Sequence, residues 1–165
     1  MDGKVKHFEP EKIIKGVRAD WLKLGGKLAT RIVTDSDKGI SQDPTGKPFK
    51  KYSKEYAILK KAGKATPKGV SSSRQVSPPN LRASGEMLNS IKAQKATKDS
   101  VEINYRSGLK VLGNANPPKR LNKPRRNIYG LNDANWEFAR DFIDAEIDGR
   151  ILKFYRKKVF FNIEI

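Results

Sequence analysis

Residues 43–53 read D-P-T-G-K-P-F-K-K-Y-S, and residues 81–91 read L-R-A-S-G-E-M-L-N-S-I. Each stretch combines a few apolar side chains with the glycine, proline and serine residues that form turns and begin short helices. Most of the segment between them is rich in glycine, serine, lysine and proline and nearly lacks apolar anchors. We therefore expect the two stretches to hold the ends of an extended basic arm, residues 35–81, that is inserted in one domain. The predicted anchors are Phe49, Tyr52, Leu81, Met87 and Ile91.

The composition favours a single domain, residues 1–165, with a compact core and long polar excursions. Of the 165 residues, 36% are hydrophobic and 32% are charged. No apolar run approaches the roughly 18 residues of a membrane span, and the polar start of the sequence offers no signal-peptide core. The absence of cysteine excludes disulfides and thiolate metal sites. We expect a protein that works without a membrane, a metal or a cofactor.

Periodic apolar residues predict two long helices. The first is expected over about 10–33, and Gly25-Gly26 inside it indicates the close approach of a neighbouring backbone. The last is expected over about 133–148, with Asn132 as its N-cap and Gly149 as its C-cap.

Shorter elements are predicted around these helices. A helix over 54–62 has Ser53 as N-cap and Gly63 as C-cap, and another begins near Ser84 and buries the apolar residues up to Ile91. The mixture predicts the α+β class: a small, mainly antiparallel β-sheet packed by a long N-terminal helix and a C-terminal amphipathic helix, with long basic loops. Alternation and short apolar runs predict strands over Val101–Tyr105, Leu109–Leu112 and Ile151–Ile165, with a tight turn at Ser107-Gly108.

Positive charge dominates the chain, which has a formal net charge of +17. Such a field attracts nucleic acid, anionic membranes or acidic proteins. Residues 38–82 hold eleven Lys/Arg and two acids, and residues 106–126 hold seven and none. These loops are expected to be solvated, to reach a partner, or to contact phosphates without reading bases. The candidate partner- or DNA-facing residues are Lys47, Lys50, Lys51, Lys60, Lys61, Lys64, Lys68, Arg74, Lys119, Arg120, Lys123, Arg125 and Arg126.

The last predicted helix carries an acidic stripe. At 100° per residue, five carboxylates fall within an arc of about 80°, separate from an apolar arc made by Trp136, Ala139, Phe142, Ile143 and Ile147. The stripe is either a solvated face or a contact for a basic surface of another copy or another protein, and contact with another copy would give a heterologous, head-to-tail interface. A divalent-metal site is disfavoured because carboxylates on one helix face seldom converge on an ion. The stripe comprises Asp133, Glu137, Asp141, Asp144 and Asp148.

Catalytic signatures are missing from the sequence. The single histidine, His7, has no partner cluster, and the serines at 71–73 lack a nearby base or oxyanion-hole motif. Gly85 and its neighbours lack the Gly-Lys-Ser/Thr ending of a phosphate loop. We therefore expect no enzymatic activity, and a small hydrolase is the least favoured interpretation.

Three stretches, in this order, resemble the motifs of the phage virion-morphogenesis and tail-completion family, which includes head–tail joining proteins of the Mu protein G type. Residues 43–53 fit the pattern D-x-x-G-x-P-(W/F)-x-x-(L/Y)-(S/T), and residues 81–91 fit L-x-x-(S/T)-G-x-(M/L)-x-x-S-I. Residues 126–131, R-N-I-Y-G-L, fit R-x-(I/F)-(Y/L)-G-L. Order and spacing agree over about 14–147, although residues 109–116 replace the usual Y-A-x-x-H-Q-x-G segment.

The resemblance implies a structural virion protein of a tailed bacteriophage that forms a homo-oligomeric ring, commonly a hexamer, at the head–tail junction. Its implied partners are other neck, portal or adaptor, and tail proteins, and its implied place is the virion after assembly in the host cytoplasm. A neck role and a tail-completion role both stay open, as does contact with genomic DNA. The alternative, from another class, is a sequence-independent nucleic-acid-binding protein, which needs only density of positive charge.

Overall fold

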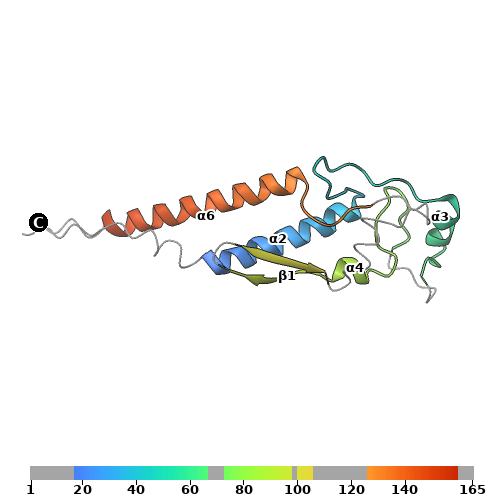
Figure 1. Cartoon of the computed structure of the whole chain (residues 1–165), viewed down its shortest axis with the longest axis horizontal. Coiled ribbons are helices and arrows are strands. Elements are labelled where there is room, and N and C mark those ends of the chain that lie inside the picture. The colour runs from blue at the N-terminus through green and yellow to red at the C-terminus, as the bar shows by residue number, and fades with distance from the viewer. Residues whose placement is uncertain (1–16, 67–72, 98–99, 106–125, 160–165) are drawn as a thin grey trace, which may run out of the picture.

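The structure of the chain is a computed structural model that describes residues 17–66, 73–97, 100–105 and 126–159. Helix α2 lies between the antiparallel helix α6 on one side and a two-stranded sheet on the other (Figure 1). Helix α3 lies at one end of the molecule (Figure 1). This arrangement confirms the predicted α+β class. The elements are α2 (Val17–Asp37), α3 (Lys54–Lys61), α4 (Glu86–Asn89), β1 (Ile91–Ala96), β2 (Val101–Tyr105) and α6 (Asp133–Val159).

The sheet is an antiparallel hairpin, and a glycine lets α2 lie directly on it. Strands β1 and β2 pair from Ile91 opposite Tyr105, with an irregularity after Ala93. A Cβ atom added at Gly25 would stand 2.9 Å from the Ala93 Cβ and would overlap Val101. Gly26 has no such neighbour within 4 Å. A close approach therefore occurs at Gly25, but the neighbours are side chains of the hairpin and not the backbone that was expected.

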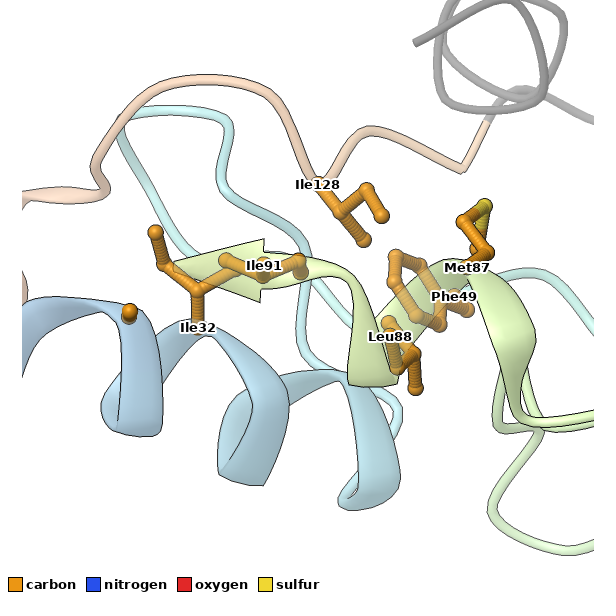
Figure 2. Close-up of a cluster of buried hydrophobic side chains, with 7 residues drawn as sticks. Ile32, Phe49, Met87, Leu88, Ile91 and Ile128 are labelled. Atoms are coloured by element: carbon orange, nitrogen blue, oxygen red, sulfur yellow. The ribbon is translucent and has the colours of Figure 1, made fainter. Parts of the chain in front are cut away.

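Two apolar clusters hold the layers together. One packs α2 against α6 through Leu24, Leu28 and Ala139. The other joins α2, α4, β1 and two loops (Figure 2). Full burial of a side chain such as Leu88 or Ile32 contributes about 1.5–3 kcal/mol each. The second cluster, called the central cluster below, comprises Ala29, Ile32, Phe49, Met87, Leu88, Ile91 and Ile128.

Helix α2 ends at Asp37, four residues beyond the predicted end at Val33. In this last part of the helix, hydroxyl groups bond back to carbonyls of the preceding turn and are satisfied within the helix. Thr34 Oγ1 donates to the Thr30 carbonyl at 2.9 Å, and Ser36 Oγ donates to the Ile32 carbonyl at 2.8 Å. The part of this prediction before Val17 lies outside the described residues.

Local capping signals predicted the short elements well. The Ser53 hydroxyl accepts a hydrogen bond from the Tyr56 amide at 3.3 Å, which confirms the N-cap of α3. The C-cap is Ala62, one residue before the predicted Gly63, which follows it with a φ of +76°. Helix α4 and strand β2 occur where they were expected. Strand β1 was not predicted, because I-K-A-Q-K-A has little apolar alternation and its core contacts are distant in sequence.

Helix α6 corrects the prediction for the C-terminal region. Its start at Asp133 is confirmed, since Asn132 Oδ1 accepts from the Asn135 amide at 3.0 Å. It continues through Gly149 to Val159, so the predicted end at Asp148, the Gly149 cap and the strand over 151–159 are wrong. Basic residues are frequent after Gly149 and favour the negative end of a helix. Residues 160–165 and the predicted strand at 109–112 lie outside the described residues.

Candidate interaction surfaces

The three stretches that carry the resemblance meet in the central cluster, although they are far apart in sequence. Residues 43–53 supply Phe49, which is buried at 5% exposure. Residues 81–91 supply Met87, Leu88 and Ile91, and residues 126–131 supply Ile128, which is fully buried (Figure 2). All three stretches therefore contribute side chains to the core of the fold.

Polar contacts join the first and third stretches at the surface of this cluster. The Asp43 carboxylate accepts from Ser41 Oγ at 2.8 Å and from Asn127 Nδ2 at 3.0 Å. The Gln42 amide donates to the Asn127 carbonyl at 2.8 Å, and the Asp133 amide donates to the Pro44 carbonyl at 2.9 Å. The turn at 43–46 is therefore tied directly to the first turn of α6.

A buried network of polar side chains fixes α6 to α2. Asp35 Oδ2 accepts from Gln42 Nε2 at 3.0 Å and from Asn135 Nδ2 at 2.9 Å. Asn135 Oδ1 accepts from Arg31 Nε at 2.6 Å. Asn135 is fully buried, and Gln42 and Asn132 are nearly so. Because these groups satisfy one another, the network orients the acidic half of α6 rigidly.

Lys60 lies inside the molecule, which differs from the expectation that it faces a partner or DNA. Its side chain is fully buried. Its Nζ donates to Tyr52 Oη at 3.2 Å, to the Asn80 carbonyl at 3.3 Å and to Asn80 Oδ1 at 2.6 Å. Burial, with a smaller effect of the Arg126 charge, lowers the pKa of Lys60 to about 8. Lys60 thus holds α3 to the loop that contains Asn80.

Arg126 is likewise directed inward. It is 9% exposed, and its Nη2 donates to the carbonyls of Lys50 and Lys51 at 3.1 and 3.4 Å. Its guanidinium lies 4.7 Å from the Tyr52 ring centroid, and Lys60 Nζ lies 4.9 Å from it. Burial raises the pKa of Tyr52 to about 12. The group Tyr52, Lys60, Asn80 and Arg126 is called the polar knot below.

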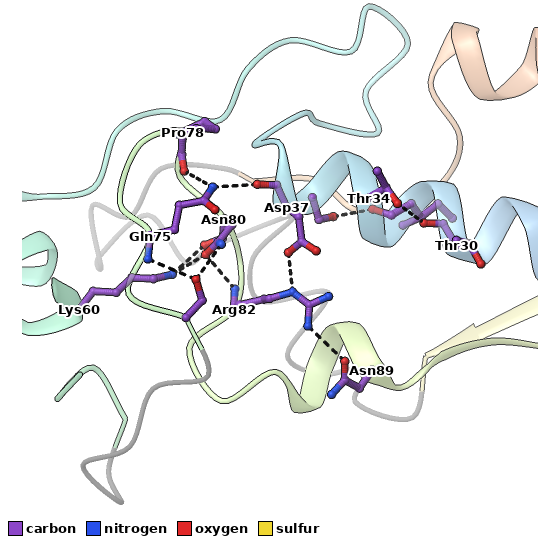
Figure 3. Close-up of polar contacts among 12 residues, drawn as sticks. Thr30, Thr34, Asp37, Lys60, Gln75, Pro78, Asn80, Arg82 and Asn89 are labelled. Atoms are coloured by element: carbon purple, nitrogen blue, oxygen red, sulfur yellow. Dashed lines mark hydrogen bonds and ion pairs between the residues drawn. The ribbon is translucent and has the colours of Figure 1, made fainter. Parts of the chain in front are cut away.

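The last residues of the predicted arm, from residue 73 onward, are attached to the C-terminal end of α2 (Figure 3). Gln75 Nε2 donates to the carbonyls of Asp37 and Pro78, each at 2.9 Å. Arg82 Nε pairs with Asp37 Oδ1 at 2.5 Å, and Arg82 Nη1 reaches Asn89 Oδ1 at 3.3 Å. Residues 73–82 are therefore held by specific contacts within the chain.

The other predicted basic residues that the structure describes are exposed. Helix α3 turns Lys60 inward and exposes Lys54 and Lys61 together with two apolar residues, Ile58 and Leu59. The apolar pair did not stand out in the sequence, because a lysine-rich helix predicts only a solvated face. The exposed predicted residues are Lys47, Lys50, Lys51, Lys61, Lys64 and Arg74, whereas Lys68, Lys119, Arg120, Lys123 and Arg125 lie outside the described residues.

The acidic stripe is exposed along α6. Glu146, which was not assigned to the stripe, turns toward α2 and pairs with Lys23 at 3.3 Å, and Arg150 pairs with Asp20. Trp136 and Ile147 were expected on the apolar arc but are 59% and 47% exposed, because α2 covers only the side of Ala139 and Phe142. Within the described ranges, no His, Cys, Asp and Glu side chains group in a way that could hold a metal. The exposed stripe residues are Asp133, Glu137, Asp141, Asp144 and Asp148.

Comparison with known proteins adds no relative, since no family model, curated protein or solved structure matches the chain. Among the described residues, no helix is both long and apolar enough to cross a membrane. The features of the chain that bear on function are therefore the three stretches, the exposed lysines around α3 and the acidic stripe on α6.

Proposed function

We propose that this chain is a structural virion protein of a tailed bacteriophage that forms a ring at the head–tail junction and joins the capsid and portal complex to the tail. The convergence of residues 43–53, 81–91 and 126–131 on one buried cluster carries this proposal. Segments that define a family's fold are expected to meet in its interior. Their side chains make packing and hydrogen-bond contacts with one another.

The charge distribution supports a protein that functions beside anionic or acidic neighbours. Lysines are exposed around α3, and carboxylates are exposed along α6. A ring of six copies, the number common in the resembled family, would carry about +100 formal charge at +17 per copy. Mutual repulsion of that size has to be reduced by contacts between opposite charges, by ions, or by DNA in the conduit.

The proposal is tested with the purified chain, alone and mixed with phage tails or portal complexes. Light scattering is expected to give a mass of several copies, and negative-stain electron microscopy is expected to show closed rings that bind one end of the tail or the portal. A chain that remains monomeric at every concentration and binds neither structure would remove the proposal.

A second function, sequence-independent binding of nucleic acid, is favoured by the exposed basic residues around α3. Apart from Glu55, the described residues 47–64 expose no acid to oppose them. Such a protein binds duplex DNA of any sequence as a monomer, and its affinity falls steeply with salt because counterions are released from phosphates. Fluorescence anisotropy at increasing salt measures this slope, and a flat response would exclude this function.

A further inference from the structure

Exposed apolar side chains are concentrated on two helices of this otherwise polar protein. Seven large apolar side chains stand out as exposed in the described part of the chain, and five of them lie on α3 or α6. The mean hydropathy of the chain is −0.70. Contiguous exposed apolar area that is rimmed by polar residues marks protein–protein contacts. The five residues are Ile58, Leu59, Trp136, Ile147 and Leu152.

The outer face of α6 combines apolar and acidic residues. At 100° per residue, Trp136, Arg140 and Ile147 fall directly beside the arc of the stripe. All are exposed, and the opposite side of the helix packs on α2. Arg140 is the one base on this face within residues 133–152. We call this surface the acidic face; it comprises Trp136, Arg140, Ile147 and the five stripe residues.

The outer face of α3 combines apolar and basic residues. Lys54, Ile58 and Lys61 follow the spacing i, i+4, i+7, so they lie in one row. Leu59 lies about 100° further around the helix than Ile58, beyond the exposed Glu55. Ile58 is 67% exposed. The inward contacts of Lys60 in the polar knot fix which side of this helix is presented. We call the row Lys54, Ile58 and Lys61 the basic face.

We propose that the acidic face of one copy binds the basic face of a second copy of this chain. This inference builds on the self-assembly that the proposed function requires, and it names the two surfaces that meet. Each face combines exposed apolar area with a rim in which one sign of charge predominates, which matches how stable interfaces are built.

Charge favours the basic face of a second copy, rather than its acidic face, as the partner of the acidic face. Residues 133–148 hold six acids and one base, a net −5, so the rest of the +17 chain sums to +22. Two acidic faces packed together would place like charges opposite each other. The basic face reverses that sign and also covers apolar area.

The two faces cannot meet within one chain, because α3 lies at one end of the molecule and α6 runs away from that end (Figure 1). Different surfaces are used on the two copies, so the contact is heterologous and repeats from copy to copy. A heterologous contact produces either a closed ring or an open filament. It is therefore the kind of contact that a ring-forming subunit needs.

Cross-linking tests the contact directly, since the chain contains no cysteine of its own. Asp144→Cys marks the acidic face, Lys61→Cys marks the basic face, and Lys92→Cys, exposed on β1, is the control. The full-length variants are treated with a short bismaleimide, singly and in pairs. The Asp144→Cys and Lys61→Cys mixture is expected to give a covalent dimer, and pairs with Lys92→Cys are expected to give none. A chain with both marked positions should give a ladder of multiples of 18.6 kDa.

The other outcomes are equally informative. Dimers from Asp144→Cys alone would mean that two acidic faces meet, which overturns the proposal. Oligomers by light scattering without cross-links in the mixture would overturn this contact and leave the ring proposal standing. A protein that is monomeric by light scattering and gives no cross-links would count against both.

Discussion

The region around α3 and the region where α2 packs on α6 are held together in different ways. Around α3, the polar knot joins Tyr52, Lys60, Asn80 and Arg126 through hydrogen bonds and cation–ring contacts. Along α2 and α6, apolar packing dominates, with ion pairs at the edge. The difference shows that a lysine-rich segment can be built into a fold when backbone and side-chain oxygens supply enough acceptors. It also separates the lysines that support structure from those free to meet a partner.

The largest loss of stability is expected from creating a cavity in the central cluster. Leu88→Ala removes a fully buried side chain from the central cluster. The loss should be about 2–5 kcal/mol in the free energy of unfolding, because a cavity adds to the lost burial. Urea denaturation followed by circular dichroism measures it. Leu59→Ala, at an exposed leucine on α3, should change stability by less than about 0.5 kcal/mol.

A smaller loss of stability is expected from a substitution in the polar knot. Lys60→Met keeps the length of the side chain but removes the donor to the Asn80 carbonyl and to Tyr52. Leaving a buried acceptor without a donor costs about 1–3 kcal/mol. Lys61→Met, at the exposed neighbour, should stay within about 0.5 kcal/mol. Equal effects of the two substitutions would mean that Lys60 is no more structural than a surface lysine.

The buried Lys60 should also make the free energy of unfolding depend on pH. Burial lowers the pKa of Lys60 to about 8 in the folded state, while the unfolded chain keeps the ordinary value of 10.5. Between these values the unfolded state binds more protons, so this group makes stability rise with pH. The window is pH 8 to about 10, since Tyr52, whose pKa burial raises to about 12, opposes the trend above that. Urea unfolding across this range should show the rise in the native chain and not in Lys60→Met.

The smallest effect on the fold, with a large effect on assembly, is expected at the acidic face. The double substitution Asp141→Lys and Asp144→Lys changes exposed residues, so the free energy of unfolding should move by less than about 0.5 kcal/mol. Light scattering should nevertheless show that self-association is lost. The reverse pair, Lys54→Glu and Lys61→Glu, should also be monomeric alone.

An equimolar mixture of these two double variants should associate again, because each then offers a face that complements the other. Lys92→Glu with Lys95→Glu, on exposed residues of β1, matches the second pair in net charge and should assemble normally. Loss of assembly in that control would mean that total charge, and not the two faces, governs association.

Signals contained within a few residues predicted much of the fold. Ser53 before α3, Asn132 before α6 and the alternation of Val101–Tyr105 each act through hydrogen bonds or packing that neighbouring residues define. The exposed stripe on α6 could also be read from helical periodicity. The extension of α6 past Gly149 could not be predicted, since the helix propensity of its neighbours and the contacts of the preceding turns outweighed one glycine.

By itself, the sequence determined where most elements begin, which class of fold they form and which face of α6 is acidic. Only the tertiary structure decided that Lys60 and Arg126 are internal, that Gly25 touches the hairpin, and that Ile58 and Trp136 are exposed. The physical reason is distance along the chain. Caps are made within about four residues, whereas Lys60 reaches Asn80 and Arg126 reaches Lys50, and such partners are set by packing.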